Sequence, residues 1–284
     1  MDSVSTTKRT TSTKIQVRSR VFATFVAFVV TVPTAAITLI SVQDEIAIGK
    51  ETNADTRKKI PELSDPAVRS YVRSIGGRLA RVAPGPRYPY SFTVANYREI
   101  NAFALPGGPL WINRGVLQAA TNESQVAAVL AHEVAHLAQR HPAQQMSNAL
   151  VANLGLGALS ALLGNVGGAG AARAAAGLGT NLWFLKFSRD DEAEADRVGL
   201  QILRRAGWDA HGMIEMFEIL KREQGRNPGA VETFLSSHPA PQDRLNALRT
   251  AVARANGGTR NTPTFQGIKA KLRKMPPARS MPKS

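Results

Sequence analysis

Residues 122–140 read NESQVAAVLAHEVAHLAQR, a pattern that predicts one long helix. Asn122 is a suitable N-cap, Gln125 lies three residues later as its reciprocal partner, and Pro142 ends or redirects the helix. Apolar residues lie on almost every side of this segment, so we expect the helix to be buried. A buried helix that carries polar side chains needs a reason for them, because burying unpaired polar groups is costly.

Those polar side chains are the histidines and the glutamate of the sequence His132-Glu133-Val134-Ala135-His136. Residues at i and i+4 lie one helical turn apart on the same face, so both imidazoles can reach a single tetrahedral zinc ion. Glu133 lies about 100° around the helix, where it can take a proton from a metal-bound water. The spacing therefore predicts a zinc site with Glu133 as general base.

A catalytic zinc site needs a third protein ligand. We exclude His141, because it lies five residues after His136, about 140° around the helix. The metzincin pattern needs a histidine six residues after the second one with a glycine between them, and position 139 is Gln. Ser188 begins another predicted helix, which ends near Gly207 and brings Glu192 and Asp196 to one face. One carboxylate can bind the metal while the other orients a histidine. The pattern alone does not choose between them.

The net charge of +15 is concentrated at the two ends of the chain. Residues 1–20 and 257–284 together carry eleven of these charges, so the body between them is nearly balanced. It shows no basic stripe with interleaved aromatic residues, and we expect no nucleic-acid partner. The chain has no cysteine, which excludes disulfides, thiolate metal sites and cysteine nucleophiles.

Residues 21–42 form an uncharged, mostly apolar run that follows the basic residues 1–20. The run is long enough to span a bilayer as a helix, and the preceding cations would stay cytoplasmic. We favour an uncleaved signal anchor over a cleaved signal peptide, with an organelle transit peptide third. Residues 257–284 are basic and rich in proline, and we expect a disordered tail.

Between these ends, the sequence predicts helices on both sides of Pro61, the second beginning at Asp65-Pro66. Strands are predicted at residues 90–97 and 109–113. Residues 148–180 contain one charge, Arg173, and many glycines and alanines. We favour two closely packed small-residue helices or a mobile flap there over a membrane hairpin.

Four motifs in order resemble one family of metallopeptidases. They are the His132–His136 motif, Glu192-Ala-Glu-Ala-Asp196, the preceding Asn101-Ala-Phe-Ala-Leu-Pro-Gly-Gly108, and the following Ser237-His238-Pro239. The family is that of HtpX, BepA, mitochondrial Oma and the CAAX prenyl endoprotease. The resemblance runs from about residue 45 to residue 248 and is greatest to the exported bacterial BepA-like type. We expect no counterpart here of the tetratricopeptide domain that follows the catalytic part in that type.

The resemblance implies a role for each matching residue. His132, His136 and Glu192 would bind zinc, Glu133 would be the catalytic base, Asp196 would orient a zinc-bound histidine, and His238 and Arg244 would lie close to the metal. A histidine at position 238 can stabilise the reacting oxyanion or occupy the open metal position in a latent state. The segment around residues 107–113 resembles the edge strand that pairs with substrate, which makes Gly107, Gly108, Leu110 and Ile112 candidate substrate contacts.

We therefore expect an α+β, predominantly helical fold with a zincin-like catalytic domain over residues 43–256. Its parts would be the active-site helix, a small sheet with a substrate-binding edge strand, and a second helix that supplies the third ligand. The expected function is that of a zinc endopeptidase, with one Zn²⁺ per chain, acting on unfolded or misassembled envelope proteins. It would be exported, anchored in the inner membrane through residues 21–42, with the catalytic domain in the periplasm. The alternatives are a latent zinc-bound chaperone or binding protein and a basic nucleic-acid binder.

Overall fold

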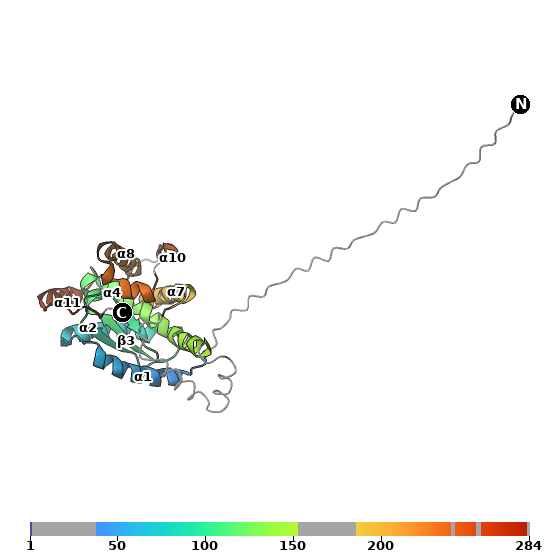
Figure 1. Cartoon of the computed structure of the whole chain (residues 1–284). Helices are drawn as coiled ribbons and strands as arrows, with labels where there is room; N and C mark the ends of the chain where they lie inside the picture. The colour runs from blue at the N-terminus through green and yellow to red at the C-terminus, as the bar shows by residue number, and fades with distance from the viewer. Residues whose placement is uncertain (2–37, 153–185, 240–241, 254–256, 283–284) are drawn as a thin grey trace. The chain divides into compact units, whose positions relative to one another are not determined.

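The computed structural model describes residue 1 and residues 38–152, 186–239, 242–253 and 257–282. Helices dominate it, as the sequence predicts, and they surround one small sheet (Figure 1). The elements in chain order are α1 (Val42–Lys59), α2 (Pro66–Val82), β1 (Ser91–Ala95), β2 (Ala102–Ala104), β3 (Pro109–Asn113), α3 (Arg114–Ala119), α4 (Glu123–Ala138), a helix over residues 141–152, α7 (Arg189–Arg205), α8 (His211–Arg226), the 3₁₀ turn η2 (Pro228–Ala230), α9 (Glu232–Ser237), α10 (Gln242–Val252) and α11 (Pro263–Lys274).

The sheet has the strand order β1-β3-β2. β1 is parallel to β3, with Ser91 opposite Pro109, and β2 is antiparallel to β3, with Phe103 opposite Trp111. The helices α2 and α4 cover one face and α1 the other (Figure 1). Because side chains alternate along a strand, β3 contributes to both layers. Leu110 belongs to the core cluster under α2 and α4, whereas Trp111 belongs to the cluster under α1.

The helix α4 lies in the centre of this arrangement. All of its residues from Glu123 to Ala138 are buried, as its apolar composition predicts. The side chain of its N-cap, Asn122, accepts a hydrogen bond from the backbone N–H of Gln125. α4 packs against α7, α8, α2 and β2, so tertiary contacts hold it along its whole length.

The C-terminal region is ordered, and the predicted disordered tail over residues 257–284 is wrong for the part that the structure describes. Thr262 caps α11, whose apolar side chains Phe265, Ile268 and Leu272 are buried. The backbone after α11 continues along the sheet layer, where Arg279 pairs with the segment that follows β1. The sequence did not predict α11, because its few apolar residues are separated by cations and flanked by prolines.

The start of the folded part also differs from the prediction. Ile40 is 1% exposed and lies in the cluster under α1, and the N–H of Leu39 donates a hydrogen bond to Ser147 Oγ. The boundary at residue 42 is therefore too late, because residues 39–41 already belong to the folded region. The rest of the apolar run, residues 21–37, and residues 153–185 lie outside the described residues. Among the helices that the structure describes, none has the length and apolarity needed to cross a membrane.

Candidate metal centre

Two helices supply most of the side chains of the candidate site. His132, Glu133 and His136 lie on α4, and α7 brings Glu192 and Asp196 against them. Ser188 and Asp191 form a capping box at the start of α7. The two helices approach closely because α7 has a glycine at the crossing: a Cβ at Gly199 would lie 3.2 Å from the Cα of His132.

Four side chains point at one small volume. One ligand atom from each of His132, His136, Glu192 and His238 can be chosen so that all four lie within 4.8 Å of one another. The two Nε2 atoms of His132 and His136 are 3.0 Å apart, and Glu192 Oε1 lies 3.3 Å from His136 Nε2. All four residues are buried. Two imidazoles at helical spacing and one carboxylate form the donor set of catalytic zinc sites.

His238 comes from the C-terminal end of α9 and closes the fourth side of the cluster. Its Nδ1 lies 2.8 Å from Glu192 Oε1 and 3.4 Å from His132 Nε2. Its Nε2 lies 3.6 Å from Glu133 Oε1. The same ring therefore faces both the metal donors and the glutamate that the sequence predicts as general base.

The environment of Glu133 is the strongest indication that this site binds a ligand. Its side chain is 1% exposed, and neither carboxylate oxygen has a hydrogen-bond partner among the described residues. Burial raises the carboxyl pKa of Glu133. A buried carboxylate that accepts no hydrogen bond is costly unless a ligand completes its environment. The residues present thus fit a metal ion together with the water or substrate that such an ion binds.

Asp196 and Arg244 lie behind His132 rather than among the donors. Asp196 Oδ1 is 3.2 Å from His132 Nδ1, and Arg244 donates two hydrogen bonds of 2.8 Å to the Asp196 carboxylate. Arg244 Nη1 also lies 2.5 Å from Glu192 Oε2. The sequence pattern did not decide which of the two α7 carboxylates binds the metal. In the structure, Glu192 faces the donor cluster, and Asp196 faces Nδ1 of His132.

These contacts move the pKa values of the buried groups. Burial opposes ionisation of Asp196, but hydrogen bonds from His132 and Arg244 outweigh it and hold its pKa below the ordinary value. Burial likewise opposes protonation of His132, yet Asp196 and Glu192 raise its pKa to about 10. Metal ions and protons compete for such a nitrogen, so the carboxylates that hold a proton on His132 also favour a bound cation.

Sequence reasoning missed the role of His141. This buried residue is outside the donor cluster, but its Nδ1 lies 2.9 Å from His136 Nδ1. Its Nε2 lies 3.5 Å from Glu194 Oε2 on α7. Each α4 histidine therefore has a partner on its outer nitrogen, which fixes the orientation of its ring. His141 and Glu194 are both visible in the sequence, but they lie on different helices, so helix spacing alone does not predict their contact.

The substrate-strand prediction needs correction. Residues 109–113 form β3, which is the central strand and is paired on both sides, so it offers no free edge. Leu110 and Ile112 are each 1% exposed. Gly107 and Gly108 form the turn between β2 and β3 with φ of 71° and 127°, a conformation that favours glycine. The strand that lies at the edge beside α4 is the three-residue β2.

The space beside the cluster is small. A cavity of about 30 Å³ adjoins His132, and its other lining residues are mostly apolar, including Met213, Phe217 and Phe234. An extended peptide needs far more room, so the described arrangement is a closed one.

A buried helix with the His-Glu-x-x-His motif, a carboxylate from a second helix and a small adjacent sheet define a zincin-like catalytic domain. The model of peptidase family M48 matches residues 66–252. The chain belongs to this peptidase family.

Three relatives show how far the similarity extends. The beta-barrel assembly-enhancing protease of Escherichia coli strain K12 is 34% identical over 221 residues, which cover 76% of this chain and 45% of that protein. The mitochondrial metalloendopeptidase OMA1 of Saccharomyces cerevisiae is 37% identical over 159 residues, 55% of this chain and 44% of that one. Metalloprotease LoiP of Escherichia coli strain K12 is 31% identical over 166 residues, 58% and 64% of the two chains. The chain spans about half the length of the first two relatives.

Proposed function

We propose that this protein is a zinc endopeptidase whose metal is held by His132, His136 and Glu192. Zn²⁺ bound there would act as a Lewis acid toward the scissile carbonyl and lower the pKa of a water. Glu133 takes a proton from the attacking water and passes it to the leaving amine. The observation that carries this proposal is the buried Glu133 carboxylate, which has no hydrogen-bond partner and adjoins four candidate donors.

The surrounding residues assist by position and charge. Asp196 holds His132 in the orientation that directs Nε2 to the metal position, and Arg244 balances the charge of both α7 carboxylates. His238 Nε2 faces Glu133 and, when protonated, can donate a hydrogen bond to the oxyanion that forms during attack.

A second candidate function is that of a latent zinc-bound chaperone or binding protein. The observation that favours it is the closed arrangement, in which His238 Nδ1 lies within the donor cluster beside a cavity of about 30 Å³. In this state His238 would complete the metal coordination and leave no open position for substrate. The intact Glu133 favours the peptidase, because a pure binding protein has no use for a buried base.

The relatives and the N-terminal sequence support a proposal for the substrates and the location. Unfolded or misassembled envelope proteins are the proposed substrates, supported by the name of the assembly-enhancing relative. The cationic residues 1–20 and the apolar run after them support export with a membrane anchor and a periplasmic catalytic domain. A reporter fused after Ser284 and assayed outside the cytoplasm tests this orientation, and the mass of the mature N-terminus tests cleavage.

Peptide release from an unfolded protein tests the activity. We expect the full chain to release peptides, to stop with a chelator, and to recover with Zn²⁺. Glu133→Gln should retain one zinc by mass spectrometry but lose cleavage. Cleavage by Glu133→Gln at the wild-type rate would disprove the base assignment. An increase in rate on His238→Ala would identify the closed arrangement as the latent one, whereas a decrease would support the oxyanion role.

A further inference from the structure

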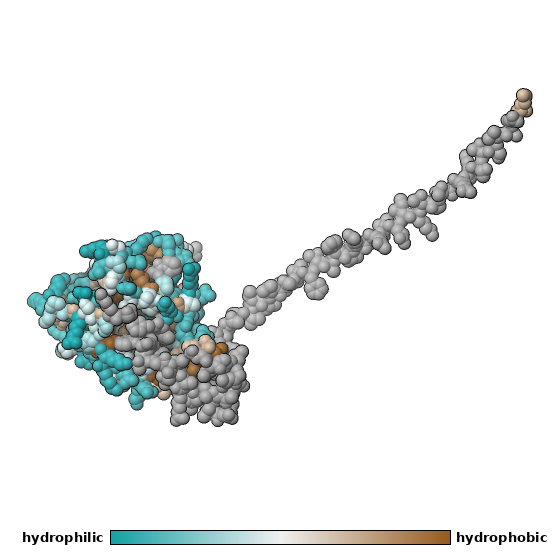
Figure 2. Space-filling view, in the orientation of Figure 1, coloured by the Kyte–Doolittle hydropathy of each residue, from teal (hydrophilic) through white to brown (hydrophobic). Residues whose placement is uncertain are grey.

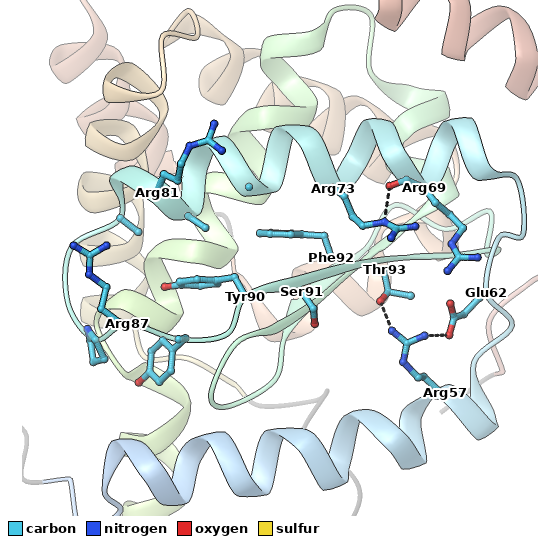
Figure 3. Close-up of a pocket in the computed structure, with 15 residues that line it drawn as sticks. Arg57, Glu62, Arg69, Arg73, Arg81, Arg87, Tyr90, Ser91, Phe92 and Thr93 are labelled. Atoms are coloured by element: carbon cyan, nitrogen blue, oxygen red, sulfur yellow. Dashed lines mark hydrogen bonds and ion pairs between the residues drawn. The ribbon is translucent and has the colours of Figure 1, made fainter.

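A cavity of about 520 Å³ lies between α2 and the beginning of β1, and no residue of the metal centre lines it (Figure 3). Its walls are α2, the loop that follows α2, and β1, with Arg57 and Glu62 at one end. On the face that Figure 2 shows, most of the surface of the described residues is hydrophilic. We call this cavity the arginine groove.

Positive charge dominates the arginine groove. Its lining includes one acid, Glu62, which is paired with one of the lining arginines, Arg57. The other lining arginines are Arg69, Arg73, Arg81 and Arg87. Among the described residues, none of these four has a carboxylate partner. Four guanidinium groups around one hollow repel one another, and an anionic ligand would relieve that repulsion.

The floor of the groove is aromatic. The rings of Tyr90 and Phe92 are stacked, with centroids 6.5 Å apart and an interplanar angle of 11°. The Tyr90 hydroxyl is buried and has no hydrogen-bond partner in the described part of the chain. Burial raises the pKa of Tyr90, so the hydroxyl stays protonated and keeps its donor. A buried hydroxyl without a partner is unusual in a folded protein, and this one belongs to a ring that lines the groove.

The groove also borders a strand edge for which no pairing is described. The N–H of Ser91 donates to Gly108 O on the β3 side, whereas Val94 O accepts from the N–H of Leu63 on the outer side. Successive residues of a strand direct their backbone groups to opposite edges, so the N–H and C=O of Phe92 face the outer side. In the described structure, pairing of that edge begins only at Val94. Such an edge can accept an added strand.

We propose that the arginine groove binds an extended acidic segment of another polypeptide, which adds to the outer edge of β1. Side chains of the added strand would alternate, so that carboxylates at every second position face the arginines of α2. Arg69 and Arg81 are twelve residues apart, about 18 Å along the helix, which an extended peptide spans with about six residues. Figure 3 shows Arg81 and Arg87 at one end of the groove and Arg69 and Arg73 toward the other.

This occupant fits better than an anionic lipid headgroup. A phosphate would use the guanidinium groups but not the open backbone of β1 or the apolar floor between the charged ends. The docking of a peptide requires neither metal nor cleavage, so it goes beyond the proposed peptidase activity. It gives the protein a second contact with a substrate or partner, away from the reacting bond.

Binding of a fluorescent peptide Glu-Val-Glu-Val-Glu-Val tests the proposal by anisotropy. The full chain carries Glu133→Gln and the buffer contains a chelator, so failure of the peptidase proposal does not affect the result. We expect Arg73→Gln and Arg81→Gln each to weaken binding by about fivefold. Arg222→Gln on α8, which makes the same charge change outside the groove, should have no effect. Affinity should also fall as salt is added.

Gly77 provides a test of the site itself. It lines the groove, and a Cβ placed on it meets no atom within 4 Å. Gly77→Tyr should fill the space and abolish binding, while Gly77→Ala should bind like the parent. A peptide N-methylated at its valines should lose most of its affinity, because it cannot pair with β1.

Three outcomes would overturn the proposal. Binding that survives both arginine substitutions places the peptide elsewhere. Equal affinity for the N-methylated peptide shows charge attraction without strand addition. Arginine-dependent capture of phosphatidylglycerol vesicles, with no peptide binding, assigns the groove to lipid instead.

Discussion

Two arginines show how the metal centre and the arginine groove differ. At the metal centre, Arg244 is 6% exposed and donates two hydrogen bonds to Asp196. In the arginine groove, Arg73 is exposed, and its one described hydrogen bond goes to the backbone oxygen of Arg69. The two arginines differ in their partners because one side chain is buried and the other is solvated. A buried charge must find its partner within the fold, while an exposed one is stabilised by water. The first region is therefore complete except for its ligand, and the second remains available to a charged partner.

The largest expected effect separates the two regions by function. Glu133→Gln should reduce peptide cleavage by about 10²–10⁴-fold, because the base that accepts the proton of the attacking water is lost. Binding of the acidic peptide to the arginine groove and the zinc content should stay unchanged. Steady-state cleavage, anisotropy and metal analysis measure these three quantities. Glu232→Gln, at an exposed position, is the control and should cleave normally; a fall in peptide affinity with Glu133→Gln would show that the regions are coupled.

The second prediction compares two arginines directly. Arg244→Gln should lower the free energy of unfolding of the metal-free protein by about 3–5 kcal/mol, because it leaves buried carboxylates without their cation. Arg73→Gln should change it by no more than about 0.5 kcal/mol. Urea denaturation followed by circular dichroism gives both values. Equal destabilisation by the two substitutions would mean that burial does not make Arg244 more important for stability than Arg73.

The third prediction concerns the support of the groove. Phe265 of α11 is 1% exposed, and its ring centroid lies 6.4 Å from that of Tyr71 on α2. Phe265→Ala should therefore cost about 3 kcal/mol of unfolding free energy through the cavity it leaves. The exposed neighbour substitution Gln266→Ala should cost little. An unchanged denaturation midpoint for Phe265→Ala would mean that α11 does not stabilise the fold.

The smallest effect is a pH dependence at the start of α2. A hydrogen bond from Lys271 and the backbone N–H groups of the helix cap lower the pKa of Asp65. A lowered folded-state pKa means that the stabilisation is present above the ordinary carboxyl pKa and is lost as pH falls through the folded value. Asp65→Asn keeps a capping side chain, so it should cost only about 0.5 kcal/mol at pH 7.

That cost should vanish at pH values below the pKa of Asp65 in the folded protein. Thermal or urea unfolding of the two proteins across the acid range measures the difference between them. A difference that persists in strong acid would mean that the charge of Asp65 is not what stabilises α2.

Much of the metal centre could be predicted because local rules determine it. The spacing of His132 and His136 on a helix, and the caps Asn122 and Ser188 at the starts of α4 and α7, need only the neighbouring residues. The small sheet was predicted in part, with β3 at residues 109–113. The approach of α7 to α4 was not predictable in detail, since it depends on how two helices cross.

The features that were missed depend on tertiary contacts. β2 is three residues long in a segment typical of a turn, and only its pairing with β3 makes it a strand. α11 looked like a disordered tail because three apolar residues among cations do not reveal a buried surface. The arginine groove combines residues of α2 with a loop and a strand edge, and no spacing rule brings these together.

The open position at Gly77 has a practical consequence in a chain without cysteine. Gly77→Cys would introduce the sole thiol of the protein, at a point where a Cβ meets no atom within 4 Å. An environment-sensitive dye attached there would change its emission when the groove fills. Such a labelled protein would screen candidate partner sequences in solution without any assay of proteolysis.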